Sequence, residues 1–79
     1  MKTRILGAYK FNSKSGKELV NFSCSDERTN GYGTCTLNIM TSSENVPCDI
    51  ADMINKDFVI DCRYGSNGSI FAQSFYPIK

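Results

Sequence analysis

The sequence predicts a mainly β domain, a small five-stranded barrel with one short helix between the third and fourth strands. Three observations predict this class. Five segments alternate with a period of two residues, turns rich in glycine and asparagine separate them, and one segment has helical spacing instead. A chain of 79 residues has room for one small core, so residues 1–79 are expected to form one domain.

The first strand is predicted at Thr3–Phe11 and the second at Glu18–Ser25, joined by a polar turn that contains Gly16. Gly7 interrupts the first strand and indicates a bend or bulge of the kind that small barrels need. Aromatic residues that alternate with polar ones on an apolar face are expected in the core. They are Tyr9, Phe11, Phe22 and Phe58.

The third strand is predicted at Thr34–Thr41, after a loop with strong reversal signals. The period then changes, because apolar residues 50, 53 and 54 follow the spacing of one helix face. Asp49 and Asp52 are placed where the helix dipole favours negative charge. A short helix is therefore predicted from about Pro47 to Asn55.

The fourth strand is predicted at Asp57–Tyr64 and the fifth at Ser69–Tyr76, with a glycine-rich turn between them. Strict alternation places Phe71 and Phe75 on the face of the fifth strand opposite Ala72. One of these two faces has to point outward unless the helix or a partner chain covers it.

Three strands, a helix and two further strands follow one another in the order of the OB-fold, a Greek-key barrel. Closure into a barrel also removes the exposed edges that a small β protein would otherwise present. The expected architecture is therefore an OB-like Greek-key barrel.

Charge is unevenly distributed along the chain. The first seventeen residues carry five positive charges and no negative one, although the net charge of the whole chain is only +1. All eight acidic residues lie between residues 18 and 62. Segregated charge usually concerns a partner, and a basic strand and hairpin on a small β protein favour a polyanion such as a nucleic acid.

The four cysteines are separated by ten, twelve and thirteen intervening residues, and the chain contains no histidine. Structural zinc sites need closely paired ligands, so we expect no metal. Free thiols buried as small apolar residues are favoured in a reducing compartment. A disulfide between Cys24 and Cys35, which flank the same loop, is the remaining alternative.

Catalysis is not expected, because histidine is absent and no catalytic constellation or cofactor motif is recognisable. No apolar run approaches the roughly 20 residues that a membrane-spanning helix needs. The short apolar run after Lys2 and Arg4 is also too short for a signal peptide. We therefore expect a cytoplasmic, non-enzymatic protein with no cofactor and no membrane partner.

Binding of single-stranded nucleic acid needs cations that follow the phosphates and aromatic faces that stack on bases. The chain offers both, so we expect sequence-independent binding of single-stranded DNA or RNA by a basic hairpin and an aromatic surface. The candidate binding residues are Arg4, Lys10, Lys14, Lys17, Arg28, Tyr32, Arg63, Tyr64 and Phe71.

Some of these residues have a simpler interpretation. Lysines at a hairpin tip can act only as solvated groups that prevent edge pairing, and this alternative stays open for Lys14 and Lys17. Tyr32 lies between two glycines and can be either a contact residue or a packed lid.

Several segments resemble the small single-stranded-DNA-binding proteins of filamentous phages, the gene-five type, and related OB-fold proteins of phages and plasmids. The likeness covers most of the chain in layout and length. The segments that carry it are Ser13-Lys14-Ser15-Gly16-Lys17, Phe58-Val59-Ile60-Asp61, Gly68-Ser69-Ile70-Phe71 and Pro77-Ile78-Lys79.

The resemblance implies that the first hairpin is a mobile DNA-binding wing with Lys14 and Lys17 on phosphates. It also implies a symmetric homodimer, formed with the help of the hairpin around Gly65 to Gly68. Binding would then be cooperative, independent of sequence and sensitive to salt.

A second class of function competes with this one. The chain can instead be a small protein-binding module of a phage or plasmid, an inhibitor or adaptor. The acidic middle of the chain would then face a basic partner, and the aromatic surface of the fifth strand would form the contact. The acidic residues concerned are Asp49, Asp52, Asp57 and Asp61.

Overall fold

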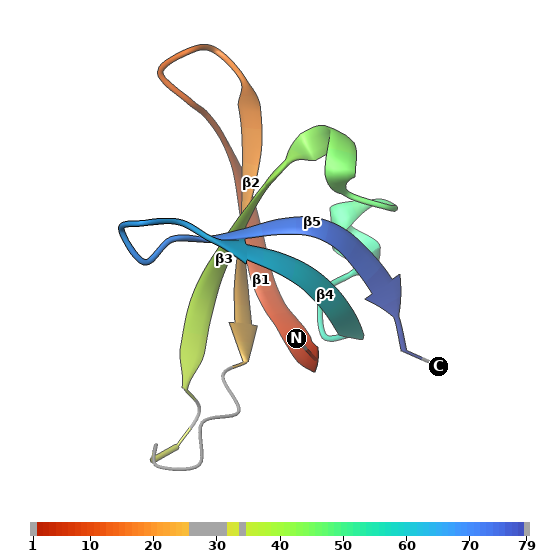
Figure 1. Cartoon of the computed structure of the whole chain (residues 1–79). Coiled ribbons are helices and arrows are strands. Elements are labelled where there is room, and N and C mark those ends of the chain that lie inside the picture. The colour runs from red at the N-terminus through yellow and green to blue at the C-terminus, as the bar shows by residue number, and fades with distance from the viewer. Residues whose placement is uncertain (1, 26–31, 34, 79) are drawn as a thin grey trace.

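Five strands dominate the computed structural model, which describes residues 2–25, 32–33 and 35–78. The strands are β1 (Lys2–Asn12), β2 (Glu18–Ser25), β3 (Thr36–Ser42), β4 (Asp57–Tyr64) and β5 (Ile70–Pro77). Two short 3-10 helices, η1 (Ser43–Asn45) and η2 (Ile50–Asp52), connect β3 to β4 (Figure 1). All five predicted strands are confirmed, with ends that differ from the predicted ones by two residues at most.

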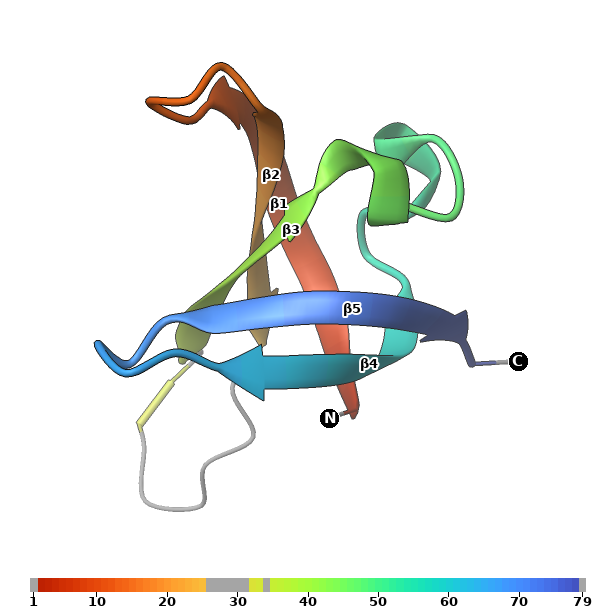
Figure 2. The same cartoon turned by 45° about the horizontal axis from the view of Figure 1, so that its top comes forward.

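The strands close into a barrel in the order β1-β2-β3-β5-β4, which confirms the expected fold class (Figure 2). Neighbouring strands are antiparallel except β3 and β5, which run parallel and share the single pair Met40–Phe71. The buried hydroxyl of Thr41 reinforces this narrow contact by donating a hydrogen bond to the carbonyl oxygen of Ala72 at 2.9 Å. The barrel therefore closes through few contacts at this side.

The segment predicted as a helix over Pro47–Asn55 forms only η2, one 3-10 turn. The carboxylate of Asp49 accepts a hydrogen bond from the backbone of Ala51 at 3.2 Å and caps this turn. Asn55 then takes a positive φ of 64°, and its N–H donates to the carbonyl oxygen of Ile5 at 2.6 Å. A longer helix is prevented because the chain is tied to β1 here and has to enter β4 two residues later.

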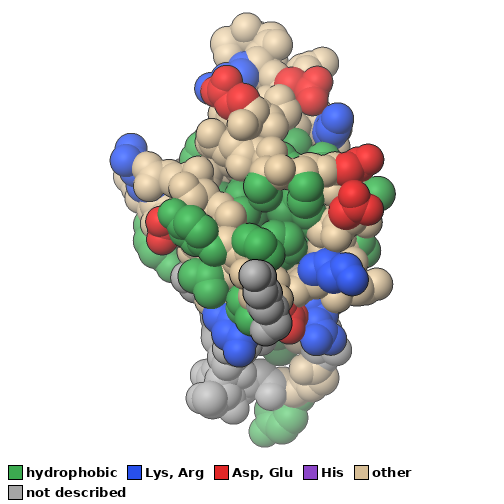
Figure 3. Space-filling view, turned by 90° about the vertical axis from the view of Figure 1, so that its right-hand side faces the viewer, with side chains coloured by type: hydrophobic (Ala, Val, Ile, Leu, Met, Phe, Trp, Pro, Cys, Tyr) green, Lys and Arg blue, Asp and Glu red, His purple; other side chains and the backbone are tan. Residues whose placement is uncertain are grey.

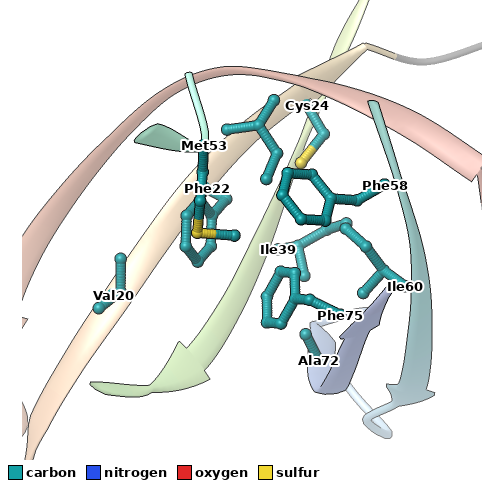
Figure 4. Packing of buried hydrophobic residues seen from close by; sticks show 10 residues of the cluster. Val20, Phe22, Cys24, Ile39, Met53, Phe58, Ile60, Ala72 and Phe75 are labelled. Atoms are coloured by element: carbon teal, nitrogen blue, oxygen red, sulfur yellow. The ribbon is translucent and has the colours of Figure 1, made fainter. Parts of the chain in front are cut away.

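Ten buried apolar residues from all five strands and the segment after η2 form the core (Figure 4). Phe75 is central, because its ring lies 5.3 Å from that of Phe22 and 6.3 Å from that of Phe58. The core residues are Ile5, Val20, Phe22, Cys24, Ile39, Met53, Phe58, Ile60, Ala72 and Phe75.

β1 contains a register shift relative to β2 between Ile5 and Gly7, which confirms the predicted irregularity at Gly7. Ile5 is buried before the shift, and Ala8 lies opposite the buried Phe22 after it. Directly opposite residues share a face of the sheet. Even-numbered residues of β1 therefore point inward after the shift, and odd-numbered residues point outward.

The shift in β1 overturns the core assignment of two aromatic residues. Tyr9 is 61% exposed and Phe11 is half-buried, whereas strict alternation from Ile5 predicts both in the core. One additional residue in the strand exchanges its two faces. Phe22 and Phe58 are buried, as predicted.

A second register shift lies in the β4–β5 pair, where Gln73 is the additional residue. Ala72 before it and Phe75 after it are therefore both buried, with exposures of 0% and 6%. The prediction that Phe71 and Phe75 share a face is wrong for this reason. Phe71 lies opposite the exposed Arg63 and points outward.

Candidate functional site

The outer surface of β1, β2 and β3 is the strongest candidate site, and we call it the ring face. Three rows of opposed residues cross it, and none of their members is charged. The rows are Gly7–Ser23–Asn38, Tyr9–Asn21–Met40 and Phe11–Leu19–Ser42. A surface that combines aromatic rings, amides and a methionine without charge can stack on planar groups and hydrogen-bond their edges.

Two rings occupy the β1 side of the ring face. The centroids of Tyr9 and Phe11 are 5.8 Å apart, with ring planes inclined at 45°. Their alternate positions on one strand place both side chains on the same side of the sheet. Tyr9 is the more accessible of the two, since 61% of it is exposed. It offers an aromatic surface to a ligand at little cost in core packing.

A pocket of about 390 Å³ opens at the β3 side of the ring face, against the turn between β4 and β5. The turn is closed by a hydrogen bond from Gly65 N–H to the Ser69 carbonyl at 2.8 Å, and Gly68 adopts a φ of +84° that favours glycine. The Asn67 side-chain oxygen accepts from the Ser69 N–H at 3.2 Å. The residues that line the pocket include Asn21, Asn38, Met40, Asn67, Ser69 and Ile70.

Phe71 and Arg63 extend the ring face across the β3–β5 contact. Phe71 is paired with Met40 of β3 on one side and with Arg63 of β4 on the other. With its amide oxygen turned toward the guanidinium, Gln73 accepts hydrogen bonds from Arg63 at 3.1 and 2.6 Å. These contacts place one oriented cation beside an aromatic side chain at the edge of the ring face.

The β1–β2 turn carries the predicted basic wing. Ser13 and Lys17 are joined by a backbone hydrogen bond of 2.8 Å, and Gly16 takes the positive φ that the turn needs. Lys14 is exposed at this turn and forms no ion pair within the part of the chain that the structure describes.

Other predicted cations are paired with acids. The ammonium of Lys10 lies 3.7 Å from the carboxylate of Glu18, and that of Lys17 lies 3.9 Å from Glu44. Lys10 is paired with the buried Val20, so its side chain leaves β1 on the side of the hairpin opposite the ring face, where it stays exposed. The positive charge expected along the first hairpin is therefore partly compensated.

Arg4 is paired as well, at the side of β1 that faces β4. Its Nε donates to Asp57 at 2.9 Å. This hydrogen bond, with the attraction of the guanidinium charge, lowers the pKa of Asp57 and raises that of Arg4. The structure does not bring Arg4 together with the rings of the ring face, and its local role is to tie β1 to β4.

Three further residues were predicted in the binding site, namely Tyr64, Tyr32 and Arg28. Tyr64 is 66% exposed and pairs with Ile70 at the end of the β4–β5 hairpin. Tyr32 is 98% exposed. Arg28 lies outside the described residues, so its predicted role is unchanged.

The central residues of the ring face are not among the predicted binding residues. Strict alternation places Tyr9 and Phe11 in the core, and no motif singles out Asn21, Asn38 or Asn67. Gly7 was the available signal, because a bulge at a glycine inside a strand exchanges the faces that follow.

The buried thiol of Cys24 offers no reactive centre. All four cysteines are free, so the alternative of a Cys24–Cys35 disulfide is not formed. Burial, with a smaller contribution from the nearby Cys62, raises the pKa of the Cys24 thiol to about 12. A thiol that stays protonated at neutral pH is a poor nucleophile and a poor metal ligand.

A larger cavity, about 570 Å³, lies elsewhere on the barrel. Pro47, Phe58, Pro77 and Ile78 contribute apolar surface to it, and Asp52 lies at its wall. Figure 3 shows the side of the molecule that carries the end of β5, where hydrophobic side chains gather between acidic and basic ones. Size alone favours this cavity, but its one aromatic lining residue, Phe58, is buried, and Asn55 is its one amide.

Within residues 2–25, 32–33 and 35–78, no three acidic or cysteine side chains cluster as metal ligands. The described helices are all too short to cross a bilayer. Comparison of the chain with protein-family models, with curated proteins and with solved structures gives no match. The function has to be inferred from the geometry of the chain itself.

Proposed function

We propose that this protein binds single-stranded nucleic acid on the ring face and acts without catalysis, as an OB-like binding domain. The observation that carries the proposal is the outward position of Tyr9 and Phe11 on an uncharged surface between the β1–β2 turn and the β4–β5 turn. OB-folds bind oligonucleotides on the corresponding face and with the corresponding loops.

Stacking supplies the main attraction. Base–aromatic stacking contributes about 1–3 kcal/mol per base and tolerates any base, because each base has a π-face. Tyr9 is accessible as the structure stands, and Phe11 lies half-buried beside it. Phe71 is half-buried on β5, next to Met40 at the far end of the same row. A strand that runs across β1, β2 and β3 toward β5 would meet these side chains in turn.

Cations at the rim supply the contacts to phosphate. Lys14 lies at one end of the ring face and Arg63 at the other. Lys10 and Lys17 are engaged by Glu18 and Glu44 in exposed ion pairs of long contact distance, and Lys10 reaches the side opposite the ring face. Electrostatic attraction is therefore modest, and about two phosphate contacts would give a slope of about −1.4 in log K against log salt.

Fluorescence anisotropy of a labelled oligo-dT strand at several salt concentrations tests the proposal. Binding that weakens with salt along this shallow slope is expected, together with weak binding of duplex DNA, in which the bases are not free to stack. Absence of binding at low salt, or equal affinity for duplex and single strand, would overturn it.

The homodimer expected through the β4–β5 hairpin stays a prediction. The turn of this hairpin lines the pocket of the ring face, so a dimer contact there would alter access to the pocket. Sedimentation velocity with and without oligo-dT measures whether the chain self-associates and whether the strand changes its mass.

A protein-binding module is the second candidate, and the outer surface of β4 and β5 favours it. Val59 and Tyr76 lie directly opposite one another with 39% and 52% exposure, and Asp61 is exposed two residues further along β4. Nuclease-resistant binding of a purified basic protein that Tyr76→Ala abolishes and Tyr9→Ala preserves would establish this function. The reverse pattern would exclude it.

A further inference from the structure

We infer that the pocket between β3 and the β4–β5 turn accepts one pyrimidine base of the bound strand, so that binding has a base preference. The inference rests on the proposed function, because the strand has to lie on the ring face for a base to enter. It differs from the sequence-independent binding that charge and stacking alone predict.

The pocket joins apolar walls to a set of amides. Leu37, Met40 and Ile70 provide apolar surface on which a flat ring can pack. Asn21, Asn38 and Asn67 bring three side-chain amides from β2, β3 and the β4–β5 turn to the same space. Small-molecule sites typically combine apolar walls with a few polar groups that set orientation.

Internal hydrogen bonds fix how two of these amides face the pocket. The Asn38 oxygen accepts from Asn21 Nδ2 at 3.3 Å and from the Ser23 hydroxyl at 3.5 Å. The Asn67 oxygen accepts from the Ser69 N–H at 3.2 Å. Since both oxygens are occupied, the NH₂ groups of Asn38 and Asn67 are the groups left to donate to a ligand.

Asn21 supplies the complementary acceptor. The residue is only 6% exposed, and its Nδ2 donates to Asn38. Its oxygen accepts no hydrogen bond from the described residues, and no fully buried side-chain oxygen among them lacks a partner, so this oxygen keeps some exposure. Because Asn21 lines the pocket, we assign that exposure to the pocket.

Two donors and one acceptor match the edge of a pyrimidine. Cytosine presents the N4 amino donor beside the acceptors N3 and O2, and thymine or uracil presents the N3–H donor between O2 and O4. Adenine offers one ring acceptor beside its amino group on either edge, so one amide N–H would stay unpaired, which costs binding energy. Guanine presents two acceptors and one donor only at N7, O6 and N1–H, which are spread along the long side of its two-ring base.

Competition within one background strand tests this assignment. The affinity for a labelled ten-residue oligo-dA is compared with the affinities for three strands in which one central base is replaced by dC, dT or dG. We expect dC and dT to tighten binding about tenfold and dG to leave it nearly unchanged. Equal affinity for all four strands, or tightest binding of the dG strand, would overturn the inference while leaving the proposed function standing.

Variants assign the preference to the pocket. Asn38→Ala removes one donor, and Asn67→Asp removes the other while keeping the oxygen that holds the Ser69 N–H. Each is expected to reduce the dC-to-dA affinity ratio about tenfold or to abolish it. Asn12→Asp, an exposed amide on β1 outside the pocket, is the control for the added charge and should keep the ratio. A ratio that survives both pocket variants contradicts the inference, and failure of every strand to bind contradicts the proposed function instead.

Discussion

β1 and β5 each contain one register shift, and the shifts have opposite consequences for the rings that follow them. After the shift in β1, Tyr9 points outward and is 61% exposed. After the shift in β5, Phe75 points inward and is 6% exposed. The same kind of shift thus gives one strand an exposed ring and the other a core residue, so removal of these two rings should have very different effects.

Removal of the Phe75 ring should have the largest effect. Phe75→Ala deletes a ring that contacts both Phe22 and Phe58, and such cavities cost about 3–5 kcal/mol of unfolding free energy. Urea denaturation followed by circular dichroism measures the loss. The neighbouring Tyr76→Ala, at 52% exposure, is the matched control and should cost far less. Similar losses of unfolding free energy for both variants would show that burial of the Phe75 ring does not decide its contribution to stability.

Removal of the Tyr9 ring should affect binding instead of stability. Tyr9→Ala is expected to weaken binding of oligo-dT by about 1–3 kcal/mol, or about 5- to 150-fold, since one stacking platform is lost. Its unfolding free energy should stay within about 1 kcal/mol of the parent, because the ring is mostly exposed. Anisotropy and urea denaturation give the two numbers. Tyr76→Ala should bind as the parent does, and an equal loss in both would place the strand elsewhere.

Closure of the barrel at β5 should depend on one buried hydroxyl. Thr41→Val keeps the shape of the side chain but leaves the carbonyl of Ala72 without its donor, at an expected cost of about 1 kcal/mol. Thr36→Val, exposed on the same strand, is the control and should be nearly neutral. Urea denaturation compares them, and an unchanged Thr41→Val protein would show that this hydrogen bond adds nothing to the β3–β5 contact.

The smallest effect should come from the start of β1, where Arg4 pairs with Asp57. Arg4 lowers the pKa of Asp57 below its ordinary value of 3.8, so the carboxylate is favoured in the folded state. The contribution of the pair is therefore present above pH 3.8 and disappears as the pH falls through the lower folded value. The stability difference between the parent and Asp57→Asn should shrink across this acidic range. A difference that is constant with pH would show that the charge is irrelevant.

Much of the fold could be predicted because strand and turn signals are local. β2 and β4 begin and end at the predicted residues, since alternating apolar side chains and flanking turns define them. The predicted helix over Pro47–Asn55 is too long. Its apolar spacing correctly indicates that Met53 is buried, but it contains no sign of the hydrogen bond between Asn55 and Ile5 that ends the turn. The candidate site was predicted less well, because three of its six predicted cations, Arg4, Lys10 and Lys17, pair with acids on other elements.

The amino-acid sequence by itself determined the strands, the turns and the barrel class, because these follow from periodicity and from residues such as Gly16 that permit the positive φ of a turn. Only the tertiary structure decided which rings face water. A single additional residue in β1 or in β5 inverts every face beyond it, and pairing with the neighbouring strand decides where that residue is accommodated. It also decided the partner of Arg4, since Asp57 lies 53 positions away along the chain.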